Sequence, residues 1–191
     1  MPDQRCLLSL AALFALSSAC SSSSRPGFQQ SSKLSFQDAV YLETTSETSA
    51  NASLGDLDGD GDLDIVLAKG RHWPLLDIVL VNDGSGSFLE RHNIGDTADR
   101  TYTAALADLD ADGDLDLVLG NDRPDGKLIY HNDGTGHFEM TGTFGDPSWP
   151  TRNVTVIDLT GDRRPDIVVA NRGGAPRGTA NYICPNDGEG Y

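Results

Sequence analysis

Short apolar runs and polar, glycine-rich turns alternate along the chain, and this pattern recurs with a period of about 50 residues. Each repeat contains one run that is apolar at almost every position, at residues 65–68, 117–119 and 167–170. Such a run without alternation predicts an inner strand that is buried on both faces. In the second repeat the whole pattern predicts four strands: Thr101–Ala107, Leu115–Gly120, Lys127–His131 and His137–Thr143.

The turn before each apolar run is strongly acidic. Residues 56–64 hold five Asp at alternating positions, residues 108–116 repeat them, and residues 158–166 form a weaker copy with three acids. We call these segments the Asp loops and number their positions 1–9. Five carboxylates in nine residues repel one another unless a cation holds them, and Ca²⁺ takes six to eight oxygen ligands. The Asp loops therefore predict Ca²⁺ sites, with an acidic turn without metal as the alternative.

The spacing within an Asp loop differs from that of an EF-hand. An EF-hand has a bidentate Glu at position 12 and continues as a helix. Here position 12 is Leu67, Leu119 or Val169, and the chain continues as a strand. The last carboxylate stands at position 9 instead. The predicted donors are therefore the side chains of positions 1, 3, 5 and 9 with the carbonyl of position 7.

A second motif recurs with nearly the same spacing as the Asp loops. The sequence Asn-Asp-Gly stands at residues 82–84, 132–134 and 186–188. We call it the hairpin marker, because its residues tolerate the positive φ of a tight turn between the third and fourth strands. A fixed period near 50 residues is typical of propellers. The predicted fold is all-β, a β-propeller with blades of four antiparallel strands, centred on residues 49–94, 101–144 and 152–191.

With these motifs the chain from about residue 34 to residue 191 resembles the FG-GAP/VCBS repeat of the integrin α-chain β-propeller and of many bacterial secreted proteins. The resemblance implies one Ca²⁺ ion in the loop between the first two strands of a blade. It implies as ligands Asp56, Asp58, Asp60 and Asp64 with the Asp62 carbonyl, and Asp108, Asp110, Asp112 and Asp116 with the Asp114 carbonyl.

The third Asp loop departs from this pattern. Thr160 replaces the acid at position 3, and Arg163 replaces the glycine at position 6. We therefore expect weak Ca²⁺ binding or none, with Arg163 or Arg164 partly neutralising Asp158 and Asp162. The oxygen donors that remain are Asp158, Thr160, Asp162 and Asp166.

Three blades cannot close a propeller, which needs at least about four. The third blade lacks its outer strand unless the segment Leu34–Leu42 supplies it. We expect either that this sequence is part of a longer propeller, whose other blades complete the ring, or that self-association completes it.

The beginning of the chain has the pattern of a targeting segment. Residues 1–19 contain one positive charge at Arg5 and an apolar run too short to span a bilayer. Small residues precede Cys20, which resembles the lipidated cysteine of bacterial lipoproteins; a secretory signal cleaved near Ala19 is the alternative. Residues 20–33 are predicted to be a Ser-rich tether. Both interpretations place the protein outside the cytoplasm, and in the lipoprotein interpretation an N-terminal lipid is its one membrane anchor.

Composition limits the partners. The net charge of −15 over 191 residues argues against nucleic acid, which needs a basic surface. Of the three cysteines, Cys184 alone lies outside the targeting segment and its cleavage site, so no internal disulfide is expected. Its apolar neighbours predict a small core residue.

The loops at the other end of the strands hold half of the 14 basic residues and both tryptophans. Arginine and exposed aromatic residues suit a protein or glycan ligand. As the alternative, the tryptophans fill gaps between blades. The candidate ligand face consists of Arg71, Trp73, Arg100, Arg123, Trp149 and Arg152.

These features favour a non-catalytic, Ca²⁺-binding module for binding, adhesion or scaffolding at the cell surface. The alternative is the propeller part of a secreted carbohydrate-active enzyme, a polysaccharide lyase or hydrolase. The sequence has no nucleophile motif, phosphate-binding loop or dinucleotide fingerprint. The acids outside the Asp loops form no paired motif of the kind that acid–base catalysis requires.

Overall fold

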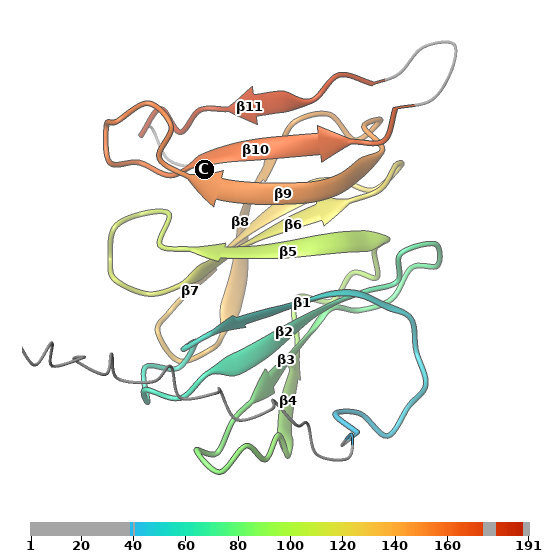
Figure 1. Ribbon diagram of the computed structural model, residues 1–191, viewed down its shortest axis with the longest axis vertical. Helices are drawn as coiled ribbons and strands as arrows, with labels where there is room; N and C mark the ends of the chain where they lie inside the picture. Colours follow the sequence, from blue (N-terminus) through green and yellow to red (C-terminus); the bar gives the residue numbers. More distant parts are fainter. Residues whose placement is uncertain (1–38, 40, 174–178, 189–191) are drawn as a thin grey trace, which may run out of the picture. The chain divides into compact units, whose positions relative to one another are not determined.

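The computed structural model describes residues 39, 41–173 and 179–188. The chain divides into two compact units, residues 1–40 and 41–191, and the strands lie in the second (Figure 1). They form three antiparallel sheets with the orders β1-β2-β3-β4, β5-β6-β7-β8 and β11-β10-β9. The bounds are β1 Ser49–Gly55, β2 Asp64–Lys69, β3 Ile78–Val81, β4 Glu90–Asn93, β5 Thr101–Ala107, β6 Asp116–Asn121, β7 Lys127–Asn132, β8 Phe138–Phe144, β9 Thr151–Ile157, β10 Asp166–Asn171 and β11 Tyr182–Cys184.

The predicted architecture of propeller blades with four antiparallel strands is confirmed in the first two sheets. Each strand predicted for the second repeat begins and ends within one residue of β5, β6, β7 or β8. The third sheet has three strands in the described part of the chain, and none of the sheets closes on itself there. The segment 34–42, expected as a further outer strand, lies mostly outside the described residues, and residues 41 and 42 are not in a strand.

The sheets pack against one another through their first strands. β1 contacts β5, and β5 contacts β9 (Figure 1). Val66 and Leu117 belong to the core shared by the first two sheets, and Val118 and Val169 to the core of the second and third. Because side chains of a strand alternate between its faces, β2 and β6 are buried on both, as predicted.

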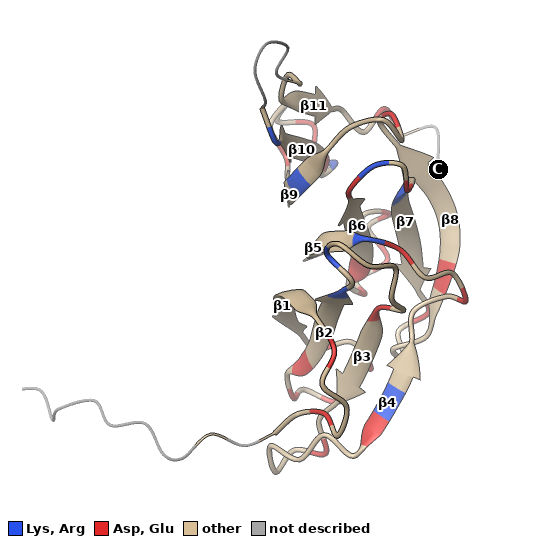
Figure 2. Ribbon diagram, turned by 90° about the vertical axis from the view of Figure 1, so that its right-hand side faces the viewer, with Lys and Arg blue, Asp and Glu red and all other residues tan. Residues whose placement is uncertain are grey.

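Burial in the first sheet decreases from β2 through β3 to the outer strand β4. β3 contains no charged residue, whereas all four residues of β4 are exposed and include Glu90 and Arg91 (Figure 2). A charged outer strand protects an unpaired sheet edge against pairing with other chains.

The prediction of full burial is wrong for the third inner strand. β10 buries Ile167 and Val169 against the second sheet, but Val168 is half-buried and Ala170 is exposed. In the neighbouring strand β11, Ile183 is 57% exposed. The reason is that the far face of this sheet is open to solvent. Cys184 is half-buried and packs against the core of the second and third sheets, in agreement with its predicted role as a small core residue.

The second and third hairpin markers also form hydrogen bonds to the preceding sheet. The Asn132 side-chain amide donates to the Leu57 carbonyl of the first Asp loop at 2.8 Å. The Asn186 amide makes the same bond to the Leu109 carbonyl of the second Asp loop at 3.4 Å. The sequence predicted only a hairpin turn here, because periodicity does not show which carbonyl a side chain reaches in the next repeat.

Asn132→Ala is expected to lower the free energy of unfolding by about 2 kcal/mol. Asn132 is 4% exposed, and its Oδ1 also accepts hydrogen bonds from the Gly134 and Gly136 amides. Alanine leaves these groups and the Leu57 carbonyl without their partner. Urea denaturation measures the loss. Asn82→Ala is the matched control. Asn82 accepts the same two bonds in its own hairpin and donates to Leu63 as Asn132 donates to Leu115, but it makes no bond to another sheet in the described part of the chain. An equal loss in both variants would contradict the role between sheets.

Candidate metal centres and the opposite loop face

Two of the three Asp loops bring carboxylates together between the first and second strands of a sheet. In each of these loops, positions 1, 3 and 9 offer one carboxylate oxygen each, and the three oxygens lie within 4.8 Å of one another. Position 5, which the resemblance also implied as a ligand, is not in either group. The residues brought together are Asp56, Asp58 and Asp64 in the first loop and Asp108, Asp110 and Asp116 in the second.

The position-9 carboxylate accepts hydrogen bonds from both its Asp loop and the hairpin marker of the same sheet. Asp64 is fully buried at the start of β2, and its two oxygens accept from the Leu57 and Asn82 backbone N–H groups, both at 2.9 Å. Asp116 makes the equivalent bonds at 2.8 and 3.0 Å, and Asp166 at 2.9 and 3.0 Å. This role was not predicted, because the sequence showed the residue only as a metal ligand.

The acids at positions 1 and 5 shape the turn itself. Asp56 accepts from the Gly59 and Gly61 N–H groups at 2.9 and 3.0 Å. Asp60 accepts from the Asp62 N–H at 2.9 Å, and Asp112 accepts from the Asp114 N–H at the same distance. The turn is therefore shaped by hydrogen bonds from the loop's own backbone amides.

The position-7 side chains lie over the hairpin markers. A Cβ atom on Gly84 would come within 2.6 Å of Asp62 Oδ2, and one on Gly134 within 2.5 Å of Asp114 Oδ2. Both glycines have a positive φ, of 80° and 78°. Glycine is required at this point of the marker by both the backbone conformation and the close approach of the loop.

The donor set of the first two loops fits Ca²⁺. Carboxylate oxygens are the ligands that this hard cation prefers. Burial raises the pKa of Asp58 above its usual value, and the charges of Asp60, Asp64 and Asp56 raise it further. Burial also raises the pKa of Asp116. A cation offsets such repulsion and desolvation, so the residues at positions 1, 3 and 9 could hold the ion.

The third Asp loop has a guanidinium group at position 7, where the first two loops have an acid. Arg164 Nη2 pairs with Asp162 Oδ2 at 2.5 Å, and Arg164 Nε donates to the Asn186 carbonyl at 2.9 Å. Arg164 stands at position 7 and lies against Gly188, where a Cβ atom would meet its Nε at 3.2 Å. Its side chain thus takes the place that Asp62 and Asp114 occupy over their hairpin markers.

The predicted neutralisation of the third loop is confirmed for Asp162. Among the ion pairs of the described residues none involves Asp158, which instead accepts from the Arg163 backbone N–H at 2.9 Å. In the described part of the chain, this loop also forms no group of three acidic ligands like those of the first two.

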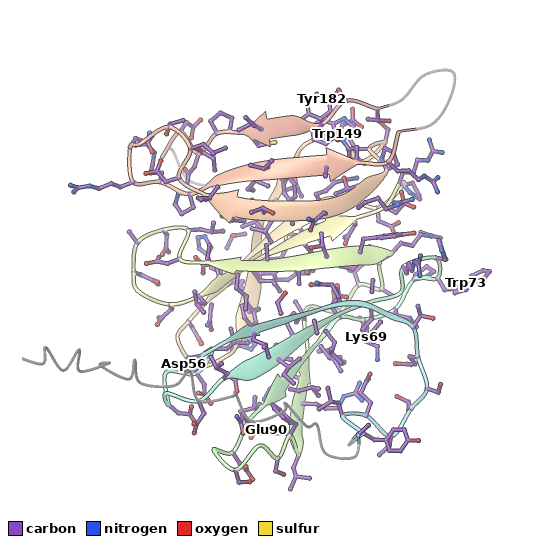
Figure 3. All side chains as sticks on the ribbon, in the orientation of Figure 1. Asp56, Lys69, Trp73, Glu90, Trp149 and Tyr182 are labelled. Carbon is purple, nitrogen blue, oxygen red and sulfur yellow. The ribbon has the colours of Figure 1, made fainter. Side chains whose placement is uncertain are left out.

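The candidate ligand face lies away from the Asp loops. Figure 3 shows Asp56 and Trp73 at opposite ends of the strands. Arg71, Trp73 and Arg123 are exposed. Two other members are engaged in ion pairs within the protein: Arg100 Nη1 with Asp125 Oδ1 and Arg152 Nη1 with Asp122 Oδ1, both at 2.9 Å.

Trp149 is a packing residue. Its ring stacks on Tyr182 of β11 with centroids 4.1 Å apart and an interplanar angle of 3° (Figure 3). A Cβ atom on Gly145 would come within 2.3 Å of the indole. This tryptophan packs against the core of the second and third sheets, which favours the alternative interpretation for this residue.

A cluster around Tyr102 was not predicted. The Arg152 guanidinium carbon lies 4.0 Å from the Tyr102 ring centroid and that of Arg71 lies 5.9 Å away. The His72 ring meets Tyr102 edge-on at 6.0 Å. We call these four residues the Tyr102 cluster. It combines side chains from all three sheets or their loops, and cation–π contacts hold the arginines over the ring.

Asp77 is a buried acid at the end of the strands that holds the Tyr102 cluster. It was not predicted from the sequence. Its carboxylate accepts from the Lys69 N–H at 2.6 Å and from Thr101 Oγ1 at 2.7 Å, and the residue is 4% exposed. Burial raises its pKa to about 7. The sequence contains no signal for this, because Thr101 belongs to the next sheet.

The raised pKa of Asp77 predicts a pH dependence of stability. Between its unfolded pKa near 3.8 and its folded pKa of about 7, the folded state holds a proton that the unfolded state has lost. The contribution of Asp77 to the free energy of unfolding is therefore largest below about pH 4. It decreases by up to about 1.4 kcal/mol per pH unit as the pH rises to about 7. Asp77→Asn is expected to remove this slope in urea denaturation at several pH values. An unchanged slope would contradict the assignment to Asp77.

The targeting segment 1–19, Cys20 and the tether 20–33 lie outside the described residues. Across the described chain, no helix has the length and apolarity that a membrane crossing requires.

Comparison with protein families agrees with this geometry. The family model described as FG-GAP-like repeat matches residues 56–119 and residues 108–169. Both matches begin at the first residue of an Asp loop, and together they span more than half of the chain. No curated protein matches the sequence. The chain therefore belongs to the FG-GAP-like repeat family.

Proposed function

We propose that this protein is a Ca²⁺-stabilised recognition module that acts without catalysis outside the cytoplasm. The observation that carries the proposal is that two kinds of side chain lie at opposite ends of the strands. Carboxylates gather at the turns between first and second strands, whereas aromatic and arginine side chains gather at the other end.

In this proposal the metal has a structural role. Ca²⁺ would be held by positions 1, 3 and 9 of the first two Asp loops and would neutralise their repulsion. The position-9 residues Asp64 and Asp116 already connect loop and hairpin marker. Binding at these residues would therefore stiffen the end of the sheet rather than activate a substrate.

The proposed recognition surface is the exposed part of the opposite face. Trp73 is 72% exposed beside Arg71 of the Tyr102 cluster. Arg123 lines a recess of about 500 Å³ together with Pro124 and Pro147. An exposed indole and exposed guanidinium groups suit a glycan or a protein surface that offers acidic groups.

Two further proposals concern the surroundings of the module. Lipidation of Cys20 would anchor it to a membrane at the cell surface, and cleavage near Ala19 would release it. Metabolic labelling with a fatty-acid probe, lost in Cys20→Ala, distinguishes the two.

We also propose that the open face of the third sheet is covered by further blades or by a second copy. Light scattering that shows a folded monomer of this chain at high concentration would contradict this.

Glycan and protein arrays probed with the full chain in Ca²⁺ test the proposed function. Arg71→Ala combined with Trp73→Ala is expected to lower binding to any ligand found by at least about tenfold while the melting temperature is kept. Leu89→Ala is the control, since Leu89 is 91% exposed but lies outside this face. Unchanged binding by the double variant, or turnover of a bound glycan, would contradict the proposal.

A further inference from the structure

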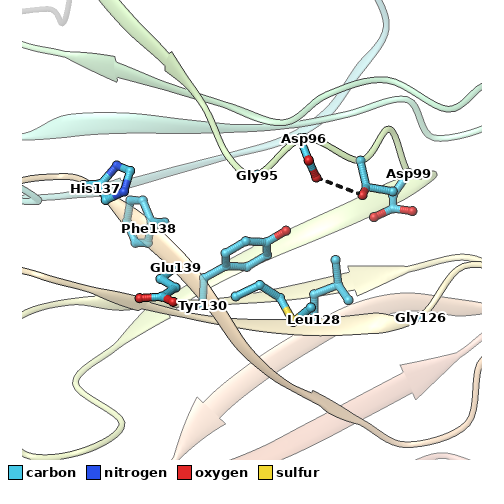
Figure 4. Close-up of a pocket in the computed structure, with 11 residues that line it drawn as sticks. Gly95, Asp96, Asp99, Gly126, Leu128, Tyr130, His137, Phe138 and Glu139 are labelled. Carbon is cyan, nitrogen blue, oxygen red and sulfur yellow. Dashed lines mark hydrogen bonds between the residues drawn. The ribbon is translucent and has the colours of Figure 1, made fainter.

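A cavity of about 680 Å³ lies between the β4–β5 loop and the strands β7 and β8 (Figure 4). This volume is within the range of small-ligand sites. None of the Asp-loop residues and none of the candidate ligand-face residues line the cavity. It is therefore separate from both of the sites described above.

Two largely buried residues in the cavity wall, Asp99 and Tyr130, have side-chain oxygens that make no hydrogen bond with a described residue. Asp99 is 9% exposed, and its backbone is fixed by two bonds to Leu75 at 3.0 and 3.1 Å, yet its carboxylate accepts no hydrogen bond from a described residue. Tyr130 is 4% exposed, and its hydroxyl likewise makes none. Their oxygens are therefore open to the cavity and available to a ligand, while the rest of each side chain is fixed by packing.

The hydroxyl of Tyr130 points toward the segment that holds Asp96 and Asp99 (Figure 4). Gly95 makes this approach possible, because a Cβ atom there would come within 2.7 Å of the Tyr130 oxygen. The loop is thus shaped so that a phenol and a carboxylate face the same space.

The other lining residues define the chemistry of the ligand. Asp96 and Glu139 add two exposed carboxylates, while the described lining contains no lysine or arginine. Ionised carboxylates only accept hydrogen bonds, so the ligand must bring donors and positive charge. Apolar side chains complete the wall and suit an aliphatic stem: Leu128, Phe138 and Met140.

A metal ion fits this cavity less well than an organic cation does. Its carboxylates do not form a group of three within 4.8 Å, in contrast to the two Asp loops of the described chain. A hard cation needs six or more oxygens close together. An ammonium group needs only a few acceptors and some apolar contact.

We infer that this cavity binds a primary alkylammonium group, with the nitrogen at Asp99 and Tyr130 and the stem along Leu128 and Met140. The group can come from a free diamine or from a lysine side chain of another protein. Burial, with the nearby charge of Asp125, raises the pKa of Asp99 to about 6, a shift that a bound cation would oppose. The inference does not depend on Ca²⁺ binding or on the proposed recognition face.

Isothermal titration of the full chain at about pH 8 in Ca²⁺ buffer tests the inference, since Asp99 is ionised there. The probes are 1,5-diaminopentane, acetyl-lysine amide with a free side-chain amine, and acetyl-norleucine amide as the uncharged match. We expect the two amines to bind and the norleucine compound not to bind. Tighter binding of the diamine indicates a free amine as the natural ligand, and tighter binding of the lysine compound indicates a protein side chain. Equal binding of the norleucine compound would overturn the inference.

Asp99→Asn keeps the size of the side chain and is expected to weaken amine binding by about tenfold or more. Its melting temperature should be equal or higher, because it removes a carboxylate whose charged form burial disfavours. Glu90→Gln on β4, outside the cavity, should leave the affinity unchanged. Unchanged affinity in Asp99→Asn, or displacement of the amine by added Ca²⁺, would also overturn the inference. Failure of Ca²⁺ binding at the Asp loops is measured separately and leaves this result intact.

Discussion

Asp116→Ala is expected to lower the free energy of unfolding by about 3–4 kcal/mol in the absence of Ca²⁺. The Asp116 carboxylate accepts from the Leu109 and Asn132 backbone N–H groups and is 1% exposed. Alanine leaves both donors buried without a partner and separates the Asp loop from its hairpin marker. Burial raises the pKa of Asp116, so loss of its charge returns part of the desolvation cost, but the two unsatisfied donors dominate.

Urea denaturation in the presence of a chelator measures this loss apart from any metal effect. Asp112→Ala is the control, because Asp112 is exposed and accepts only from the Asp114 N–H at 2.9 Å. We expect it to cost less than about 1 kcal/mol. If the two variants were equally destabilised, position 9 would have no special role in joining the loop to the sheet.

Asp58→Asn combined with Asp110→Asn is expected to abolish the stabilisation that Ca²⁺ gives to the wild-type protein. At a free Ca²⁺ concentration about 100 times the dissociation constant, each site adds about 2.7 kcal/mol to the free energy of unfolding. Two sites therefore add about 5 kcal/mol. The double variant loses one ligand of each three-carboxylate group and should gain less than about 1 kcal/mol.

Without Ca²⁺ the same double variant should be at least as stable as the wild type. Burial and then the neighbouring carboxylates raise the pKa of Asp58, so a neutral amide relieves desolvation and repulsion at this point of the loop. Asp162→Asn in the third loop is the control and should leave the Ca²⁺ response unchanged, because Arg164 already pairs with that carboxylate. An undiminished Ca²⁺ response in the double variant would show that the ion binds elsewhere.

The sequence was sufficient to predict the blades and the place of the Asp loops. Contacts within a blade are set by fixed spacings, so Gly55 faces Asp64 and Ala107 faces Asp116 wherever the motif occurs. The departure of the third loop was also readable, since Arg164 stands where the other loops have an acid. Local chemistry and local geometry are sufficient for these features.

Features that depend on packing between blades could not be predicted. Arg100 and Arg152 looked free for a ligand, but Asp125 and Asp122 from a neighbouring loop neutralise them. The stacking of Trp149 on a residue of the third sheet is likewise invisible in a periodic pattern. These contacts form only once the twist of the sheets brings loops of different repeats together.

Asp60 and Asp112 show a related limit of the resemblance. They stand at position 5, which the repeat motif implies as a ligand, but each accepts a hydrogen bond from the amide two residues ahead and lies outside the group of three carboxylates. Spacing alone cannot distinguish an acid that bends the loop from one that faces the ion.

Calorimetric titration of Ca²⁺ into the metal-free chain is the most direct test of the central claim. The account predicts two sites per chain, one in each Asp loop that has three converging carboxylates, and none in the double variant of Asp58 and Asp110. No binding heat, or a third site of equal affinity from the loop that contains Arg164, would contradict it.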